Sequence, residues 1–318
     1  MENPFVYGQS MLGKAFTNRG KEIDYLFREL QSSARIFLIS PRRYGKSCLL
    51  HVVKEKLEQE GVLVAYVDLY RITSMSQLAG VYASAILTTA HTRIERAIRA
   101  ILEMLAHLRP KITIESTGAP SVMLDYSFKS KETWKELEVV YQLPQRIAQR
   151  RKKRFVVMLD EFQEISIIGG DLLEKQLRAV IQTHTDVSYV FAGSKRHLLY
   201  EMVRDEGRPF YRMGEIYNLD KIPEKEMADF VLDKFSQTGY KIEPSTAGFI
   251  LTEMRNIPYN VQLLCHHLWA QTRDVKIVKV EDVVSAIRDL VYTYEPIFGE
   301  LWDRALRCTK KTYCEQSL

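Results

Sequence analysis

Short apolar runs alternate with helical periodicities over the first two thirds of the chain. Four of these runs have the length of strands: residues 36–39, 62–69, 155–159 and 187–191. Their apolar residues are nearly continuous rather than alternating, which is typical of a parallel sheet that is buried on both faces. Apolar residues at helical spacing precede the first run, over 23–30, and follow it from about Lys46. The pattern therefore predicts an α/β core in which helices flank a parallel sheet.

The middle of the chain is less regular. Residues 75–108 have a helical pattern. Two short runs, 111–114 and 122–124, could then pair as strands across the turn region 116–120. We interpret the segment from about 75 to 145 as an insertion of helices and a hairpin within the α/β core.

From about Leu219 the pattern becomes helical. Four apolar helical faces follow one another, over residues 227–231, 247–254, 261–268 and 283–291. They predict a small helical bundle, which we interpret as a lid domain. The expected organisation is a core over 1–218, a lid over 219–300 and a tail over 301–318, which is either frayed or the truncated approach to a winged helix.

Composition narrows the class of protein. The 318 residues are 46% hydrophobic and 27% charged, which is ordinary for a globular protein and excludes a disordered chain. No run reaches the roughly 18 apolar residues of a membrane-spanning helix, so we expect no membrane contact. The four cysteines have no paired spacing, which favours a reducing, cytoplasmic location. The net charge of +5 suits phosphate-bearing partners without requiring them.

The strongest chemical signal lies between the first apolar run and its helix. Residues 40–47, SPRRYGKS, fit the phosphate-binding pattern G-x-x-x-x-G-K-[ST], with Ser40 in place of the first glycine. If that position required a positive φ, serine would cost about 1 kcal/mol. Backbone N–H groups of such a loop and of the following helix point at phosphates, and Gly45 allows a close approach.

Two side chains of this loop have distinct expected roles. Lys46 would reach the β- and γ-phosphates, and the Ser47 hydroxyl would ligate Mg²⁺. The alternative is an ordinary turn that contains a glycine. The predicted nucleotide-binding residues of the loop and its helix are Ser40, Pro41, Arg42, Arg43, Tyr44, Gly45, Lys46, Ser47 and Cys48.

Two further strand ends add carboxylates and a hydroxyl. Asp160 and Glu161 follow the run 155–159, and a buried parallel strand delivers such residues to the sheet edge where ligands bind. We expect Asp160 to hold Mg²⁺ through water, and Glu161 to orient and deprotonate the attacking water. Ser194 follows the next run and would contact the γ-phosphate. The alternatives are solvated acids at a strand end and an ordinary Gly-Ser turn.

Together these motifs resemble those of prokaryotic P-loop ATPases of the archaeal type, which are related to AAA+, STAND and origin-recognition ATPases. The resemblance covers roughly residues 1–300. It depends on the following segments: 3–5, 16–22, 41–47, 159–163, 192–194, 208–212 and 256–259. It implies that the segment from Phe16 to Arg19 borders the adenine, and that Ser194 is the sensor on the fourth strand.

The resemblance also implies an arginine that completes the charge around the γ-phosphate, from the same chain or from a neighbour. Arg212 is the first candidate and Arg208 the second, and either could instead be a surface arginine paired with a carboxylate. Pro258 would lie in a turn that packs against the nucleotide base. In that turn Asn256 replaces a glycine, and Tyr259 stands where relatives often have an arginine.

We therefore expect a P-loop protein that binds ATP and Mg²⁺ and hydrolyses ATP to ADP, with the nucleotide state moving the lid. The predicted catalytic residues are Lys46, Glu161, Ser194 and Arg212, and the predicted metal ligands are Ser47 and Asp160.

Two alternatives stay open. One is a STAND-like switch that holds ATP or ADP with negligible turnover, and the other is a DNA-loading ATPase. The basic run 150–154 could bind DNA, although such a run before a buried strand is usually a solvated helix end. A homo-oligomer or a protein partner also stays open.

Overall fold

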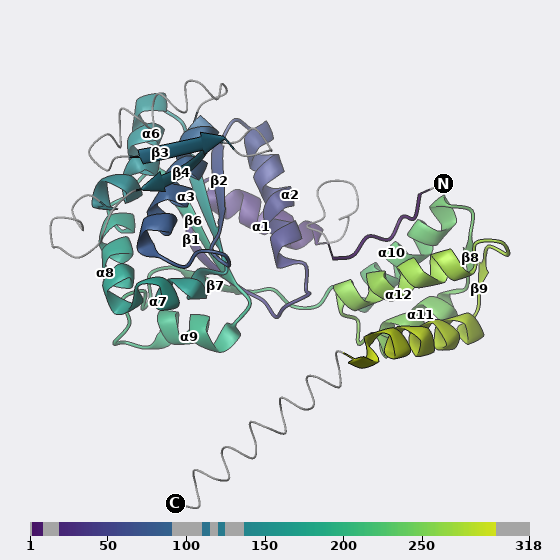
Figure 1. Cartoon of the computed structure of the whole chain (residues 1–318). Helices are drawn as coiled ribbons and strands as arrows, with labels where there is room; N and C mark the ends of the chain where they lie inside the picture. Colours follow the sequence, from purple (N-terminus) through teal and green to yellow (C-terminus); the bar gives the residue numbers. More distant parts are fainter. Residues whose placement is uncertain (1, 9–18, 91–109, 115–119, 125–136, 297–318) are drawn as a thin grey trace, which may run out of the picture. The chain divides into compact units, whose positions relative to one another are not determined.

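The computed structural model describes residues 2–8, 19–90, 110–114, 120–124 and 137–296 (Figure 1). They form two compact units. One is an α/β unit, Arg19–Asp220, and the other is a helical unit, which combines residues 2–8 with residues 221–296. Within these described residues, no helix is both long and apolar enough to cross a membrane.

The α/β unit is built on a five-stranded parallel sheet with the strand order β2-β5-β6-β1-β7. Its strands are β1 (Arg35–Ile39), β2 (Leu63–Asp68), β5 (Phe155–Asp160), β6 (Val187–Gly193) and β7 (Glu215–Asn218). The four predicted strands are confirmed. The fifth, β7, was not predicted, because it is four residues long and none of its side chains is fully buried.

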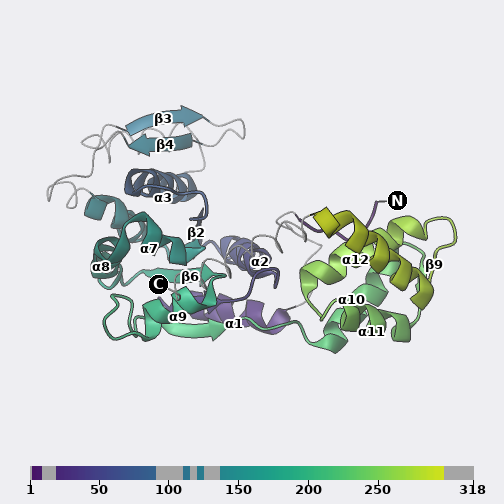
Figure 2. The same ribbon diagram turned by 60° about the horizontal axis from the view of Figure 1, so that its bottom comes forward.

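Helices cover both faces of this sheet (Figures 1 and 2). They are α1 (Gly20–Leu30), α2 (Lys46–Gln59), α3 (Met75–Ala90), α6 (Leu143–Arg151), α7 (Ile165–Ile168), α8 (Gly170–Ile181) and α9 (Arg196–Arg204), with a 3₁₀ turn, η2 (Phe162–Glu164). Strand residues alternate between the faces. Phe37, Val157 and Phe191 share a core with α3, α6 and α8. On the other face Tyr66 contacts His51 of α2, and Ser188 donates a hydrogen bond to the end of α1.

The expected insertion at about 75–145 contains the predicted hairpin. Strands β3 (Pro110–Ile114) and β4 (Pro120–Leu124) pair antiparallel, with Ile112 opposite Val122, which confirms the pairing. The hairpin lies beside α3 (Figure 2). Both ends of the segment, however, belong to the main core, because α3 and the helical residues 137–141 bury their apolar side chains there.

The helical unit has a core of its own. Its elements are α10 (Glu224–Gln237), α11 (Pro244–Glu253), α12 (Pro258–Gln271), a helix over residues 280–296, and the short paired strands β8 (Lys241–Ile242) and β9 (Ile277–Val278). The four predicted apolar faces meet in this core, which includes Val231, Ile250, Leu264 and Val283.

Residues 2–8 belong to the helical unit, whereas the sequence analysis expected them in the α/β core. Phe5 is 1% exposed and its ring lies 4.7 Å from that of Phe235. The Phe5 carbonyl oxygen is 2.7 Å from Nδ1 of His266, and the Asn3 side chain donates to the His266 carbonyl at 3.0 Å. A segment of seven residues is too short to show a helical or strand periodicity, so pattern analysis does not reveal where its aromatic side chains pack.

We expect Phe5→Ala to lower the free energy of unfolding by about 3–5 kcal/mol, because it leaves a cavity in a packed core. Urea unfolding followed by circular dichroism measures this change. The control, Tyr292→Ala, removes a side chain of the same unit that is 78% exposed, and it should change the free energy by less than about 0.5 kcal/mol. Equal stability of the two variants would contradict the burial of Phe5.

Candidate functional site

The phosphate loop occupies residues 40–45, between the end of β1 and the start of α2. Ser40 is buried, and its amide donates to the Gly193 carbonyl at 3.2 Å, so the loop is attached to the end of β6. The left-handed residues of the loop are Arg43, with a φ of 71°, and Gly45, with a φ of 85°. Ser40 has no positive φ, so its substitution for glycine brings no backbone strain.

The loop presents the N-terminal end of α2. Gly45 is the N-cap of this helix, Lys46 is its first residue, and the first turn contains no acidic side chain. The free N–H groups and the helix dipole make this end electropositive. It is therefore suited to bind an anion such as a phosphate group.

Lys46 is buried beside two carboxylates at the end of β5. Its side chain is 6% exposed; Nζ forms an ion pair with Asp160 and lies 3.3 Å from Oε1 of Glu161. Burial lowers the pKa of Lys46, and the negative charge of Glu161 opposes that change. The ammonium group is thus the counterion of both carboxylates.

The second oxygen of Asp160 accepts two hydroxyl hydrogen bonds. Ser47 Oγ donates at 2.7 Å, and the hydroxyl of Tyr66 on β2 donates at 2.8 Å. A hydroxyl and a carboxylate are oxygen ligands of the kind that Mg²⁺ uses together with substrate phosphates. Ser47 and Asp160 therefore fit the predicted metal site. No group of three or more His, Cys, Asp or Glu side chains in the described residues could hold a metal ion.

Glu161 is held from two sides. Its backbone is left-handed, with a φ of 52°. Oε2 accepts hydrogen bonds from Gln163 Nε2 at 2.6 Å and from Ser194 Oγ at 2.8 Å, while Oε1 faces Lys46. Burial alone would raise the pKa of Glu161, but the charge of Lys46 and these hydrogen bonds outweigh it, so the pKa is lowered.

Gln163 and Tyr66 were not identified by sequence reasoning. Gln163 is fully buried in η2, and its Oε1 has no hydrogen-bond partner within the described part of the chain. It packs so closely on Gly193 that a Cβ at that glycine would lie 2.1 Å from Oε1. Gln163 stood inside the motif 159–163, but nothing in the pattern shows that a 3₁₀ turn returns its amide to Glu161. For Tyr66, the one signal is a hydroxyl between the apolar residues Ala65 and Val67 of the strand.

The two candidate arginines lie on the loop after α9. Arg208 is paired with carboxylates, at 2.6 Å from Glu174 and 3.5 Å from Asp171. Arg212 is exposed and left-handed, and its guanidinium lies 5.0 Å from the centre of the Tyr211 ring. Arg208 thus has the environment of a structural ion pair, and the role of Arg212 in charge neutralisation stays a prediction.

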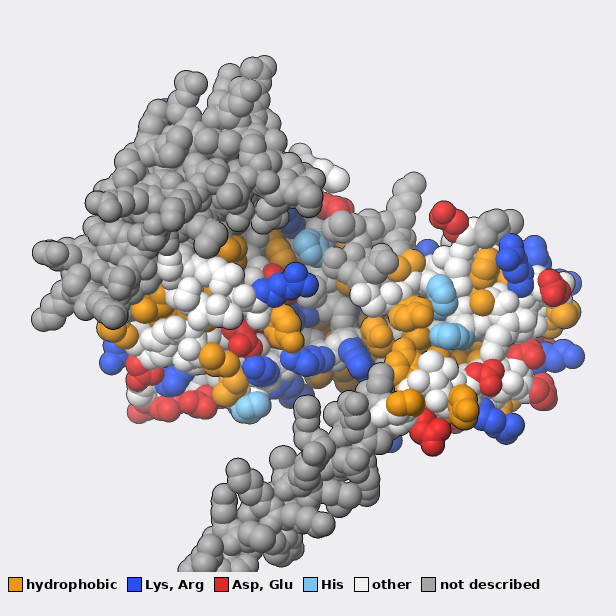
Figure 3. Space-filling model, in the orientation of Figure 1, with side chains coloured by type: hydrophobic (Ala, Val, Ile, Leu, Met, Phe, Trp, Pro, Cys, Tyr) orange, Lys and Arg blue, Asp and Glu red, His pale blue; other side chains and the backbone are white. Residues whose placement is uncertain are grey.

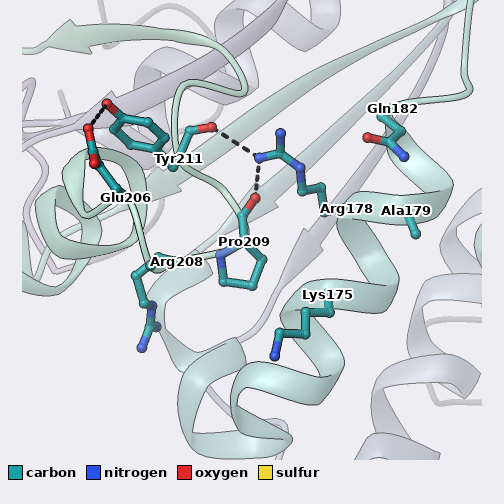
Figure 4. A pocket seen from close by; sticks show the side chains of 9 residues that line it. Lys175, Arg178, Ala179, Gln182, Glu206, Arg208, Pro209 and Tyr211 are labelled. Atoms are coloured by element: carbon teal, nitrogen blue, oxygen red, sulfur yellow. Dashed lines mark hydrogen bonds between the residues drawn. The ribbon is translucent and has the colours of Figure 1, made fainter.

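The same loop is attached to α8 by another arginine. Figure 4 shows Arg178 reaching the carbonyl groups of Pro209 and Tyr211, with the second contact at 3.0 Å. Arg208 points away from Arg178 in this view. Arg178, Arg208 and Lys175 are among the residues that line a surface pocket of about 410 Å³.

The remaining predicted nucleotide-binding residues belong to both units. Phe16 lies outside the described residues. Arg19 is buried, with its guanidinium 2.9 Å from the Tyr44 carbonyl oxygen. Cys48 is half-buried in α2. Pro258 is the first residue of α12 in the helical unit, after Asn256, whose φ of 49° is a conformation that asparagine tolerates in place of glycine.

Comparisons with known proteins agree with this geometry. Residues 16–251 match the family described as an ATPase domain predominantly from Archaea. No curated protein matches the chain in sequence.

Three solved structures share the fold. A Walker-type ATPase of Pyrococcus abyssi has a TM-score of 0.63 and 14% identity, over 93% of this chain and 77% of that one. The ORC2 protein of Aeropyrum pernix, solved as ADPNP–ADP complexes, has a TM-score of 0.55 and 13% identity, over 91% and 70%. The ORC1 protein of Aeropyrum pernix in complex with DNA has a TM-score of 0.54 and 15% identity, over 91% and 71%.

These structures confirm the predicted fold class, a P-loop core with a parallel sheet flanked by helices and a helical region after it. The family match covers well over half of the chain and includes the phosphate loop and the β5 and β6 strand ends. The resemblance to archaeal-type P-loop ATPases is thereby confirmed as well. The chain belongs to the family of ATPase domains found predominantly in Archaea, and it is an ATP-hydrolysing P-loop enzyme.

Proposed function

We propose that this ATPase binds ATP at the phosphate loop and that Glu161 activates the water that attacks the γ-phosphate. The observation that supports the proposal is the position of the Glu161 carboxylate, between Lys46 on one side and Ser194 on the other. A cation, a base and a hydroxyl are thus gathered at the sheet edge beside the electropositive end of α2, as phosphoryl transfer to water requires. The similar fold of ORC2, solved with ADPNP and ADP, supports an adenine nucleotide as the ligand.

Lys46 would change partners when ATP binds. In the structure it neutralises Asp160 and Glu161, and the triphosphate brings a competing set of negative charges to the start of α2. Lys46 then neutralises the phosphates. Ser47 and Asp160 are left with the oxygen donors that would hold Mg²⁺. When bound, Mg²⁺ neutralises charge that develops on the phosphate oxygens.

Glu161 is suited to accept the proton of the attacking water. Burial raises its pKa, while the charge of Lys46 and the hydrogen bonds from Gln163 and Ser194 lower it. The two hydrogen bonds remain when Lys46 moves to the phosphates, and they continue to favour the ionised carboxylate. Gln163 and Ser194 fix its direction through Oε2, so the release of Lys46 frees Oε1 without freeing the whole side chain. Positioning of the base and charge neutralisation are the two contributions that this chain makes.

We further propose that the α/β unit is the predicted core and the helical unit the predicted lid. The nucleotide state would then change the arrangement of these two units. The chain passes between the units next to the α/β sheet, and loss of the γ-phosphate removes contacts at the phosphate loop. In a STAND-like switch the same site would bind nucleotide with negligible turnover. Steady-state turnover therefore distinguishes the two.

DNA binding is not part of this proposal. The ORC1 structure includes DNA, but the similarity to it is one of fold. The basic run 150–154 is exposed at the C-terminal end of α6, where cations stabilise the helix dipole. On the face shown in Figure 3, basic and acidic side chains are mixed over the described surface.

The central test is Glu161→Gln, which removes the base and keeps the size of the side chain. We expect steady-state phosphate release to fall by about 10²–10⁴-fold, while calorimetry still detects ATP binding. The control, Glu58→Gln, alters an exposed carboxylate of α2 whose partner is Lys54 at 2.7 Å, and it should keep most of the turnover. Wild-type turnover in Glu161→Gln would disprove the assigned base. Tight ADP retention with almost no phosphate release from the wild type would favour the switch.

Gln163→Met tests how Glu161 is positioned. The substitution keeps an unbranched side chain beside Gly193 but removes the donor to Oε2. Because a hydrogen bond to a carboxylate stabilises the charged form, its loss raises the pKa of Glu161. Activity needs the ionised carboxylate, so the acid limb of the kcat/KM profile should move to higher pH, by about one unit for a bond to a charged group.

Ser194→Ala should shift the acid limb in the same direction, since it removes the second donor to Oε2. Gln142→Met provides the matched control, because the side chain of Gln142 contacts His184 rather than Glu161. An acid limb that stays in place in Gln163→Met and in Ser194→Ala would show that these contacts do not set the ionisation of Glu161.

A further inference from the structure

The chain passes twice between the two compact units, immediately before Arg19 and immediately after Asp220. The crossing points are attached to the phosphate loop and to β1, the strand that leads into it. The amide of Leu219 donates to the carbonyl of Ile39 at 2.9 Å, which extends the β1–β7 pairing to the last residue before the loop. The second attachment is made by the side chain of Arg19.

Arg19 connects three parts of the α/β unit. Its Nη2 donates to the Asp220 carbonyl at 2.7 Å and to the Tyr44 carbonyl at 2.9 Å. Its Nη1 pairs with Glu22, in the first turn of α1, at 2.9 Å. One guanidinium therefore joins the first crossing point, the second crossing point and the phosphate loop.

This arrangement is energetically demanding. Arg19 is 1% exposed, its φ is 89°, and its Nε has no hydrogen-bond partner within the described residues. Burial lowers the pKa of Arg19, and the charge of Glu22 opposes that change. Burial of a cation and a left-handed backbone both lower the stability of the folded state unless hydrogen bonds and ion pairs compensate for them. Two of these contacts are made to backbone carbonyl oxygens, that of Tyr44 in the phosphate loop and that of Asp220 after β7.

The contact with Tyr44 has a direct consequence for the loop. The Tyr44 carbonyl and the Gly45 amide belong to one planar peptide group, so a hydrogen bond that fixes the carbonyl also fixes the direction of the N–H. Gly45 is the N-cap of α2, at the end where phosphate is expected. A rotation of this peptide group on ligand binding would alter the Arg19 contact, and with it the contact to Asp220.

We propose that Arg19 is a positioning residue that orients the Gly45 amide toward phosphate and transmits the state of the loop to residues 219–222, where the chain enters the helical unit. The inference depends on the proposed nucleotide site. It assigns the adenine-bordering Arg19 of the sequence analysis a different task, through the carbonyl groups of Tyr44 and Asp220.

Hydrogen–deuterium exchange with and without saturating ADP tests this inference. In the wild type, ADP should change the exchange rate of the amides of residues 219–222 by about fivefold or more, the lower range of ordinary coupling between sites. Arg19→Met removes all three contacts, and the response should be lost. Arg19→Lys keeps the charge without the planar fork that spans several acceptors, so it should fold and show a strongly reduced response.

Two controls separate this role from general stability. Arg28→Met changes an exposed arginine of the same helix and should keep the response. Lys21→Gln changes an exposed side chain in the first turn of the same helix and should also keep it. Failure of wild-type calorimetry to detect ADP would refute the proposed nucleotide site. If ADP binds but residues 219–222 do not respond, or if Arg19→Lys responds fully, only the inference about Arg19 is wrong.

Discussion

The ion pair of Lys46 with Asp160 and Glu161 is the interaction on which the site depends. It brings a cation from the start of α2 together with two carboxylates from the end of β5, all at one sheet edge. Buried charges are tolerated only when they are paired and hydrogen-bonded, and removal of one partner costs several kcal/mol. In the structure the three groups satisfy one another. In the proposed mechanism a triphosphate enters by exchange of partners, and this exchange links binding to the release of Glu161.

The parallel sheet makes this exchange geometrically feasible. Since β1, β5 and β6 are neighbours with aligned carboxyl ends, the phosphate loop, Glu161 and Ser194 lie at the same edge. The register is strict, because Ile39 lies opposite Gly193 and the absence of a side chain there leaves room for Gln163. A larger residue at Gly193 would displace the amide that holds Glu161. The carboxylate that we propose as the base is thus positioned by strand register as much as by its own hydrogen bonds.

Local pattern was sufficient for the elements with many buried residues and for the charged ends of strands. It predicted β1, β2, β5 and β6, the helical bundle and the hairpin, and the pair formed by Ser47 and Asp160 is close enough to share a ligand. It failed where one side chain makes a contact that the pattern of apolar and polar positions does not reveal. Phe5 packs on α10, and Gln163 returns to Glu161 from a one-turn helix. Neither contact can be predicted from periodicity. The periodicity of apolar residues indicates which face of an element is buried, but it does not indicate which side chain packs against that face.

Arg19 shows a further reason why such contacts are hard to find. Two of its partners are backbone carbonyl groups, so the side chains of Tyr44 and Asp220 take no part in these hydrogen bonds. Substitution at either partner would leave the acceptor in place, and only Arg19 and its counterion Glu22 are constrained by type. The proposed coupling between the phosphate loop and residues 219–222 acts through backbone acceptors. It is therefore insensitive to most substitutions at the residues that provide these acceptors. It is sensitive to the conformation of the loop, because rotation of one peptide group moves the acceptor itself.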